Sequence, residues 1–301
     1  MTAHTASRRL IIAATASAVV FSVGGYVLKE HNRPRALEVY IFNLKSGRSM
    51  FIRTPDDRRI LVDGGANSDI VREITGILPF YSRRIDVVMA THGFDKDVSG
   101  LIDVLNRYTV DNLYVPKYLT ASSSGTAYSI LLKTAAARHI NVSAAQAGNT
   151  MLLDRDVAMK ILFPLTPQEF AYSAASGPEI IFKLVYGATS ILSLGSSSRK
   201  VQRFLARAQG TSSALGALDH VDVAVYDSAM IAANVSEDLM TILQPNYVVY
   251  AKRVSAAGAR AAAVSEQRSY DPLAGILADH RWNIREKGTI RIISDGKTVH
   301  F

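Results

Sequence analysis

One histidine and two aspartates lie close together in the segment His92-Gly93-Phe94-Asp95-Lys96-Asp97, shortly after an apolar run that ends at Met89. Imidazole nitrogens and carboxylate oxygens are the donors that bind Zn²⁺ or Mn²⁺. The segment also precedes an apolar pattern typical of a helix, and acidic residues in the first turn of a helix interact favourably with its dipole. Two interpretations follow, a small metal site or the polar start of a helix, and we favour the second.

A run of three serines, Ser196 to Ser198, is a second place where chemistry could arise. No G-x-S-x-G nucleophile elbow surrounds it, so we expect it to cap a helix that begins near Arg199. Spacings of 3 and 4 put the basic residues of that helix on one side, where they could contact phosphates or form a solvated face, and we favour the solvated face. These residues are Arg199, Lys200, Arg203 and Arg207.

The composition excludes several classes of protein. Apolar residues make up 48% and charged residues 20% of the 301 residues, values typical of a globular chain. The absence of cysteine excludes a disulfide scaffold, a thiolate metal cluster and a cysteine nucleophile. The net charge is +8, but residues 36–301 carry 29 basic and 25 acidic residues, so the charge of the body does not indicate a nucleic-acid binder.

The N-terminal region predicts a membrane segment. Residues 10–28 contain no charge and follow Arg8-Arg9, and 19 helical residues span the hydrocarbon core of about 30 Å. We expect a cytoplasmic stretch at 1–9, a signal-anchor at 10–28, a linker at 29–36 and one domain at 37–301 outside the cytoplasmic membrane. The alternative is a cleaved signal peptide, including the twin-arginine type, which would make the protein secreted or periplasmic.

Beyond the linker, the hydrophobic pattern predicts alternating strands and helices. Expected strands in the first half are 37–42, 50–53, 59–62, 85–89 and 113–115, and expected helices are 70–78, 98–108 and 128–138. In the second half we expect strands at 157–163, 180–186, 190–194, 221–225, 247–250 and 289–293, and a helix at 199–208. This order indicates an α/β sandwich.

Four segments resemble landmarks of the metallo-β-lactamase fold, in the same order. They are Ile52-Arg-Thr-Pro-Asp-Asp-Arg-Arg-Ile-Leu-Val-Asp-Gly-Gly65, Met89-Ala-Thr-His92, Leu184-Val-Tyr-Gly-Ala-Thr-Ser-Ile-Leu-Ser-Leu-Gly195 and Gly288-Thr-Ile-Arg-Ile-Ile-Ser-Asp-Gly296. The chain is most similar to the extracellular domain of ComEC-type DNA-uptake proteins. The resemblance implies an αββα four-layer sandwich, with two mixed sheets face to face and helices outside.

The family's metal-binding loop reads His-x-His/Asp-x-Asp-His. In this chain His92 keeps the first position, whereas Phe94 and Lys96 replace the second and third ligands and Asp97 replaces the last histidine. Ser196 stands where the family has an aspartate. The family's Gly-His-His-Gly-Ser run is Tyr226-Asp227-Ser228-Ala229-Met230, its late histidine is Asp271, and its early acidic segment is Asn43-Leu-Lys-Ser-Gly-Arg48. Asp63 survives, and the resemblance gives it a supporting role.

These replacements favour a membrane-anchored, non-catalytic domain that binds no metal. We expect Phe94 to fill the volume of the lost ligand and the Lys96 ammonium to lie near the vacated metal position. Its partners would be the membrane and DNA or other envelope and competence proteins, with no small-molecule substrate identified. One alternative is a divergent Zn- or Mn-dependent hydrolase or nuclease with a site rebuilt from His92, Asp95 and Asp97, completed by Asp227 or Asp271. The other is a structural envelope protein without a nucleic-acid role.

Overall fold

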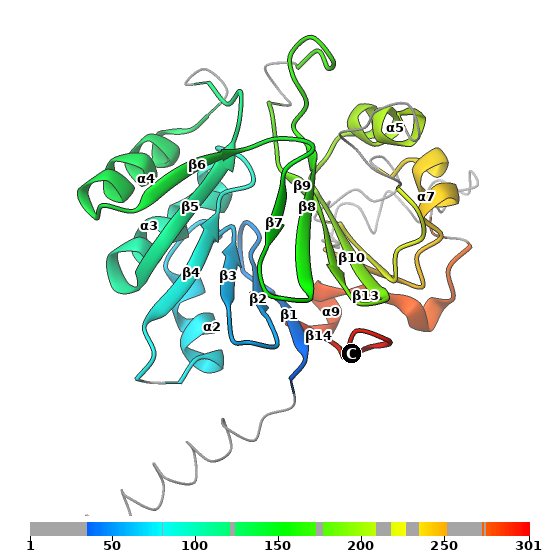
Figure 1. Cartoon of the computed structure of the whole chain (residues 1–301), viewed down its shortest axis with the longest axis horizontal. Coiled ribbons are helices and arrows are strands. Elements are labelled where there is room, and N and C mark those ends of the chain that lie inside the picture. Colours follow the sequence, from blue (N-terminus) through cyan, green and yellow to red (C-terminus); the bar gives the residue numbers. More distant parts are fainter. Residues whose placement is uncertain are drawn as a thin grey trace, which may run out of the picture. The chain divides into compact units, whose positions relative to one another are not determined.

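The computed structural model describes residues 35–79, 81–120, 124–172, 177–208, 218–226, 235–251, 273 and 275–301 (Figure 1). The predicted membrane segment at 10–28 lies outside these residues. Among the helices that are described, none has the length and apolar character needed to cross a membrane. The fold described below is that of the compact unit formed by residues 36–301.

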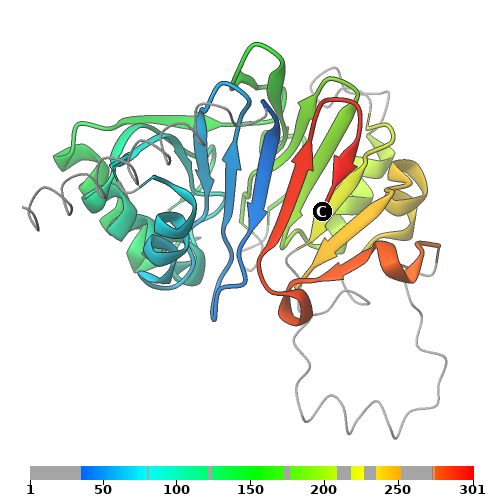
Figure 2. The same cartoon turned by 90° about the horizontal axis from the view of Figure 1, so that it is seen from below.

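The first sheet contains eight strands among the described residues, in the order β15-β14-β1-β2-β3-β4-β5-β6. Strands β14, β1, β2 and β3 pair antiparallel, whereas β3, β4, β5 and β6 pair parallel. The strand bounds are β1 Leu37–Ile41, β2 Met50–Arg53, β3 Arg59–Val62, β4 Arg84–Met89, β5 Thr109–Pro116, β6 Asn141–Ala145, β14 Ile290–Ser294 and β15 Val299–His300. Figure 2 shows β14 beside β1, although the two strands lie at opposite ends of the domain sequence.

The second sheet contains seven described strands in the order β13-β12-β11-β10-β9-β8-β7. It has the same division into an antiparallel part, β7 to β10, and a parallel part, β10 to β13. The bounds are β7 Thr150–Leu152, β8 Val157–Phe163, β9 Ile181–Tyr186, β10 Thr189–Gly195, β11 Val223–Tyr226, β12 Tyr247–Tyr250 and β13 Arg281–Asn283.

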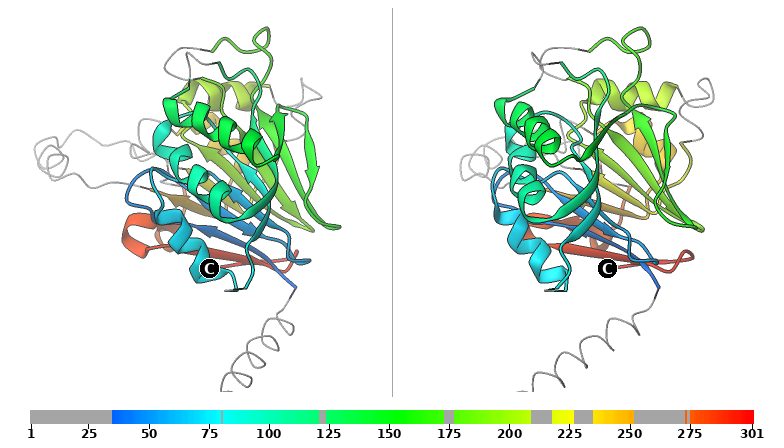
Figure 3. Two further views of the ribbon diagram at one scale, coloured as in Figure 1. Left: turned by 90° about the vertical axis from the view of Figure 1, so that its left-hand side faces the viewer. Right: turned by 60° about the vertical axis from the view of Figure 1, so that its left-hand side comes forward.

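Helices cover the outer face of each sheet and complete four layers (Figure 3). The first sheet packs against α2 (Asp69–Ile77), α3 (Asp95–Arg107) and α4 (Thr126–Ala137), and the second packs against α5 (Arg199–Arg207) and α7 (Glu237–Leu243). A separate apolar cluster, which includes Val39, Ile60, Phe182 and Val223, lies between the sheets. A short 3-10 turn (Ala278–His280) and α9 (Ile284–Lys287) flank β13.

The predicted two-sheet α/β sandwich is confirmed. The parallel strands require crossover connections, and the described helices α2, α3, α4, α5 and α7 supply those between β3 and β6 and between β10 and β12. The sequence pattern missed β6, β7, β13 and β15, which stand at the edges of the two sheets and bury few side chains. An edge strand lacks the hydrophobic alternation by which strands are recognised in a sequence.

Candidate functional site

The candidate site lies where the parallel strands of the first sheet end. Asp63 directly follows β3, and Thr91 and His92 follow β4, so the three side chains reach the same edge of the sheet. Gly195 ends β10 of the second sheet, and Arg48 lies in the turn before β2. The carboxyl ends of parallel strands are where α/β proteins gather functional residues.

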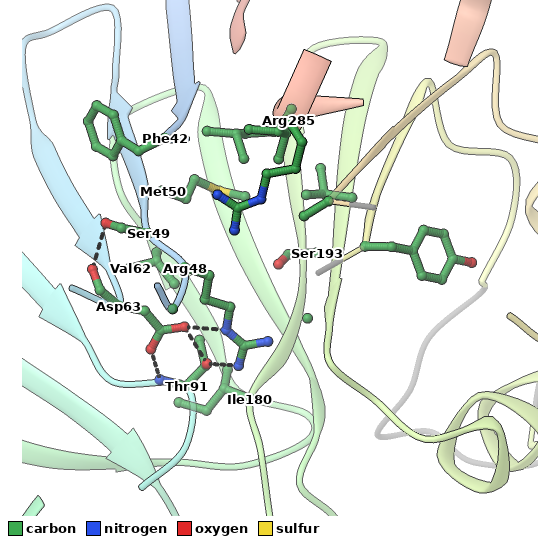
Figure 4. A pocket seen from close by; sticks show the side chains of 17 residues that line it. Phe42, Arg48, Ser49, Met50, Val62, Asp63, Thr91, Ile180, Ser193 and Arg285 are labelled. Atoms are coloured by element: carbon green, nitrogen blue, oxygen red, sulfur yellow. Dashed lines mark hydrogen bonds and ion pairs between the residues drawn. The ribbon is translucent and has the colours of Figure 1, made fainter. Parts of the chain in front are cut away.

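Asp63 is the centre of a buried hydrogen-bond network (Figure 4). Its Oδ1 accepts the backbone N–H of Thr91 at 2.7 Å, and its Oδ2 accepts the Thr91 hydroxyl at 2.6 Å. The same Oδ2 accepts Arg48 Nε at 2.9 Å, and Arg48 Nη2 donates to Thr91 Oγ1 at 2.7 Å. The resemblance implies that Asp63 has a supporting role. In this chain Asp63 binds the guanidinium of Arg48.

The cation in the site is Arg48, and the expectation that Lys96 would supply it is wrong. Lys96 is exposed, and it forms no ion pair with a carboxylate of the described residues. The first turn of α3 turns Lys96 outward and Asp97 inward, where Asp97 is 1% exposed. Arg48 has the room it needs because Gly195 has no Cβ. A Cβ at Gly195 would lie 2.7 Å from Arg48 Nη1.

Asp97 and His92 form a second buried pair beside this network. His92 Nε2 lies 3.0 Å from Asp97 Oδ2 without the alignment of a hydrogen bond, and Asp97 Oδ1 accepts the backbone N–H of Arg48 at 3.0 Å. Burial raises the pKa of Asp97, but the contact with His92 and the positive charges of Arg48 and Lys96 outweigh it, so the pKa is lowered. Asp97 is therefore a carboxylate near neutral pH.

Asp95, the third ligand candidate of this segment, caps a neighbouring helix. Its Oδ1 accepts the backbone N–H of Ala127 at 2.8 Å, which satisfies the second residue of α4. Gly125, the residue before α4, allows this approach, since a Cβ there would lie 2.0 Å from the same oxygen. The Asp95 carboxylate therefore binds the start of α4 and is not directed at His92.

Replacing Asp95 by alanine is expected to lower the free energy of unfolding by about 0.5–2 kcal/mol, because α4 loses a capping acceptor. Denaturant unfolding measures the change. The matched control is Lys96→Ala, one residue away and exposed, which should change stability by no more than about 0.5 kcal/mol. Equal losses in the two variants would contradict the capping role.

Phe94 does not fill a vacated ligand volume, contrary to expectation. Its ring is 36% exposed and lies on the His92 ring, with the two centroids 4.5 Å apart. The backbone N–H of Phe94 also donates to His92 Nδ1 at 3.3 Å. Phe94 therefore covers His92 from outside and holds its ring orientation, because it precedes the first turn of α3 on the outward side.

Glu179 is a buried member of the site that sequence analysis missed. It is 7% exposed, and its Oε2 accepts the Ser196 hydroxyl at 3.4 Å. The backbone N–H of Ile180 donates to Thr91 O at 2.7 Å, which holds this segment against β4. Burial, assisted by the charge of Asp63, raises the pKa of Glu179 against the opposing effects of Arg48, His92 and Ser196. Glu179 therefore loses its proton less readily than an exposed glutamate does.

The described residues do not fit a divalent metal ion. No three His, Asp or Glu side chains in this part of the chain converge as a ligand set. The Asp63 oxygens and Asp97 Oδ1 accept protein hydrogen bonds, and a fixed guanidinium lies beside Asp63. The remaining ligand candidates, Asp227 and Asp271, and the replaced position Ser228 lie outside the described residues.

The serine run caps α5 as predicted, since Ser198 Oγ accepts the backbone N–H of Val201. Helix α5 buries its apolar side and exposes Lys200, Arg203 and Arg207, whereas Arg199 is half-buried. Lys200 Nζ donates to Ala171 O at 3.0 Å and lies 5.0 Å from the centre of the Phe170 ring. Arg203 and Arg207 remain on the outer surface of the domain, and a phosphate-binding role for this helix stays a prediction.

Comparison with known proteins identifies the fold. No protein-family model and no curated protein matches the chain. Among solved structures, Tm1679, a metal-dependent hydrolase of the β-lactamase superfamily, aligns with a TM-score of 0.53 at 11% identity, over 86% of this chain and all of that one. The described two-sheet sandwich is therefore consistent with the metallo-β-lactamase fold, a fold of metal-dependent hydrolases.

Two other solved structures align with lower scores. Zn²⁺-bound PqqB from Methylobacterium extorquens has a TM-score of 0.45 at 15% identity, over 71% of this chain and 87% of PqqB. A mutant of CmlA β-hydroxylase has a TM-score of 0.48 at 15% identity over 72% of this chain. The chain spans only 46% of the length of CmlA.

Proposed function

We propose that this chain is a non-catalytic binding or scaffold domain with the metallo-β-lactamase fold. The observation that carries the proposal is the guanidinium of Arg48, which is held by Asp63 and Thr91 at the strand ends where the resemblance expects the metal centre. Hydrolysis by this fold requires a metal-bound water of lowered pKa. A guanidinium contributes a single positive charge and cannot bind and acidify a water in that way.

The residue set around Arg48 supports the same proposal. His92 is the only imidazole in this buried cluster among the described residues, and its Nδ1 already accepts a hydrogen bond. Asp97 faces His92 and the Arg48 backbone, and Asp95 caps α4. Each surviving candidate from the metal loop therefore makes at least one hydrogen bond within the protein, while His92 Nε2 and Asp97 Oδ2 face each other without one.

We further propose that the domain is held at the outer face of the cytoplasmic membrane by residues 10–28 and takes part in DNA uptake or another envelope process. The uncharged N-terminal segment and the resemblance to ComEC-type proteins support this part of the proposal. The exposed basic residues of α5, Lys200, Arg203 and Arg207, are the surface on which phosphate contacts would form.

Metal content and hydrolysis test the proposal on the purified full-length chain. We expect neither Zn nor Mn in stoichiometric amount by elemental analysis, and no hydrolysis of DNA or a phosphodiester with either metal added. Metal-dependent hydrolysis that a chelator abolishes would show that the proposal is wrong and that the site is rebuilt as a hydrolase.

A DNA-binding titration at two salt concentrations tests whether DNA is the partner, because binding through α5 weakens with salt and with Arg203→Gln. Absence of DNA binding would favour the structural envelope role.

A further inference from the structure

A small cavity, partly open to solvent, lies between the two sheets, directly beside the Arg48 network (Figure 4). Its volume, taken as the space open to the centres of water molecules, is about 40 Å³. Such a space holds on the order of three water molecules. The cavity therefore has room for a molecule of a few non-hydrogen atoms.

Three polar side chains line the cavity from different elements. Arg48 extends from the turn before β2, Arg285 from α9 and Ser193 from β10. In Figure 4 the Arg285 side chain comes from above and the Ser193 hydroxyl lies below its guanidinium, whereas the Arg48 guanidinium is directed toward Asp63 and Thr91. Both side-chain types donate hydrogen bonds, so the cavity presents a convergent set of donors.

The first observation that indicates a ligand in the cavity concerns Ser193. The residue is 8% exposed, yet its hydroxyl has no hydrogen-bond partner among the described residues. Ser193 lines the cavity, so water or a ligand in the cavity can supply the hydrogen-bond partner that the protein does not. The Ser193 hydroxyl is thus available to a molecule in the cavity.

Arg285 supplies the second sign, an uncompensated positive charge. Its Nη1 donates to Asn43 Oδ1 at 2.8 Å and to Leu44 O, both neutral acceptors. Its buried Nε has no partner, and no carboxylate of the described residues pairs with it. Arg285 is half-buried, and a guanidinium with an unused N–H is a good donor to a carboxylate, so Arg285 favours an anion in the cavity.

The charge balance limits the anion to a single negative charge. Arg48 already pairs with Asp63 at 2.9 Å, and the carboxylate of Asp97 lies beside the Arg48 backbone. Only the charge of Arg285 remains to be neutralised within the described site. A dianionic phosphate would meet the repulsion of Asp63 and Asp97, whereas a carboxylate carries one charge and matches a guanidinium in geometry.

The walls of the cavity are apolar and come from both sheets. They are formed by Ile41, Met50 and Val62 on one side and by Ile180, Val225 and Ile284 on the other. Apolar walls around a few convergent donors are the usual form of a site for a small organic ligand. The walls match a short hydrocarbon chain attached to the anionic group.

We propose that this cavity binds a short-chain monocarboxylate, with its carboxylate held by Arg285 and Ser193 and its hydrocarbon part against the apolar walls. The carboxylate site rests on the proposed binding role, because it treats this end of the sandwich as a ligand site and not as a hydrolytic centre. It names a chemical class of ligand, which the fold alone does not provide.

Calorimetric titration of the purified full-length chain with propanoate, in the presence of a chelator, tests the proposal. We expect saturable binding to one site, no binding of propanamide and weaker binding of inorganic phosphate. Arg285→Gln should weaken propanoate binding by about tenfold or more, because a charge-assisted hydrogen bond is lost. Ser193→Ala should weaken it by about two- to tenfold, the range for a neutral hydrogen bond.

The matched control is Lys287→Gln, which removes one positive charge from the exposed side of the same helix, α9, and should leave binding unchanged. Because Arg285 also holds residues 43 and 44, the Ser193→Ala variant provides a test that does not disturb that contact. Undetectable propanoate binding, equal binding of propanamide, or equal affinities in the parent, Arg285→Gln and Ser193→Ala chains would overturn the proposal. Metal-dependent hydrolysis together with the expected propanoate series would refute the non-catalytic role and leave the carboxylate site intact.

Discussion

Replacing Arg48 by methionine is expected to lower the free energy of unfolding by about 3–5 kcal/mol, the range for breaking a buried ion pair from one side. Arg48 Nε lies 2.9 Å from Asp63 Oδ2, and the two side chains are 11% and 2% exposed. Removal of the guanidinium leaves the Asp63 carboxylate buried with Thr91 as its remaining side-chain partner. Denaturant unfolding of the parent and variant chains gives the difference.

A second substitution separates the ion pair from packing. The double variant Arg48→Met with Asp63→Asn should recover a large part of the loss, because it leaves no uncompensated buried charge. Arg58→Met is the surface control. Arg58 pairs with Asp86 at 3.1 Å, but its side chain is 58% exposed, so we expect a change within about 1 kcal/mol. A loss of that small size at Arg48 would mean that the guanidinium does not stabilise the site.

The layers of the fold could be predicted because their residues show the local periodicity of buried elements. The apolar spacing at Val98, Leu101, Val104 and Leu105 predicted a helix, and all four side chains of α3 are fully buried. Turn residues such as the Asp63-Gly64-Gly65 stretch marked where strands end. Local patterns of this kind depend only on residues near one another in the chain.

The site was less predictable because its contacts join distant segments. Arg48 stands where the resemblance expects an acidic residue, so the sequence showed a missing carboxylate but not the guanidinium contact with Asp63 and Thr91. Glu179, a single acid before a strand, carries no sequence signal of burial. Asp95 reads equally well as a ligand or a helix-capping residue, and only the position of α4 decides between them.

Asp97 and Glu179 make the stability of this domain depend on pH in two separate ranges. Asp97 has a pKa below its ordinary value of 3.8, so its contribution to stability is present above that value and is lost as the pH falls through the folded-state pKa. Glu179 has a pKa above its ordinary value of 4.5, so its contribution is complete below that value and is lost as the pH rises toward the folded-state pKa. The free energy of unfolding therefore has an acid limb and a limb at higher pH.

Glu179→Gln is expected to remove the limb at higher pH, because glutamine keeps the shape of the neutral carboxyl group and cannot ionise. The variant should gain stability relative to the parent as the pH rises above 4.5, by about 1.4 kcal/mol for each tenfold difference in proton affinity between the folded and unfolded chains. Denaturant unfolding between pH 3 and pH 9 measures how the free energy of unfolding changes with pH. A constant offset from the substitution does not alter that slope.

The control variant, Asp97→Asn, should instead flatten the acid limb and leave the limb at higher pH unchanged. If the two substitutions altered the same limb, or if the parent and Glu179→Gln curves stayed parallel across the range, Glu179 would not have the raised pKa that its burial implies.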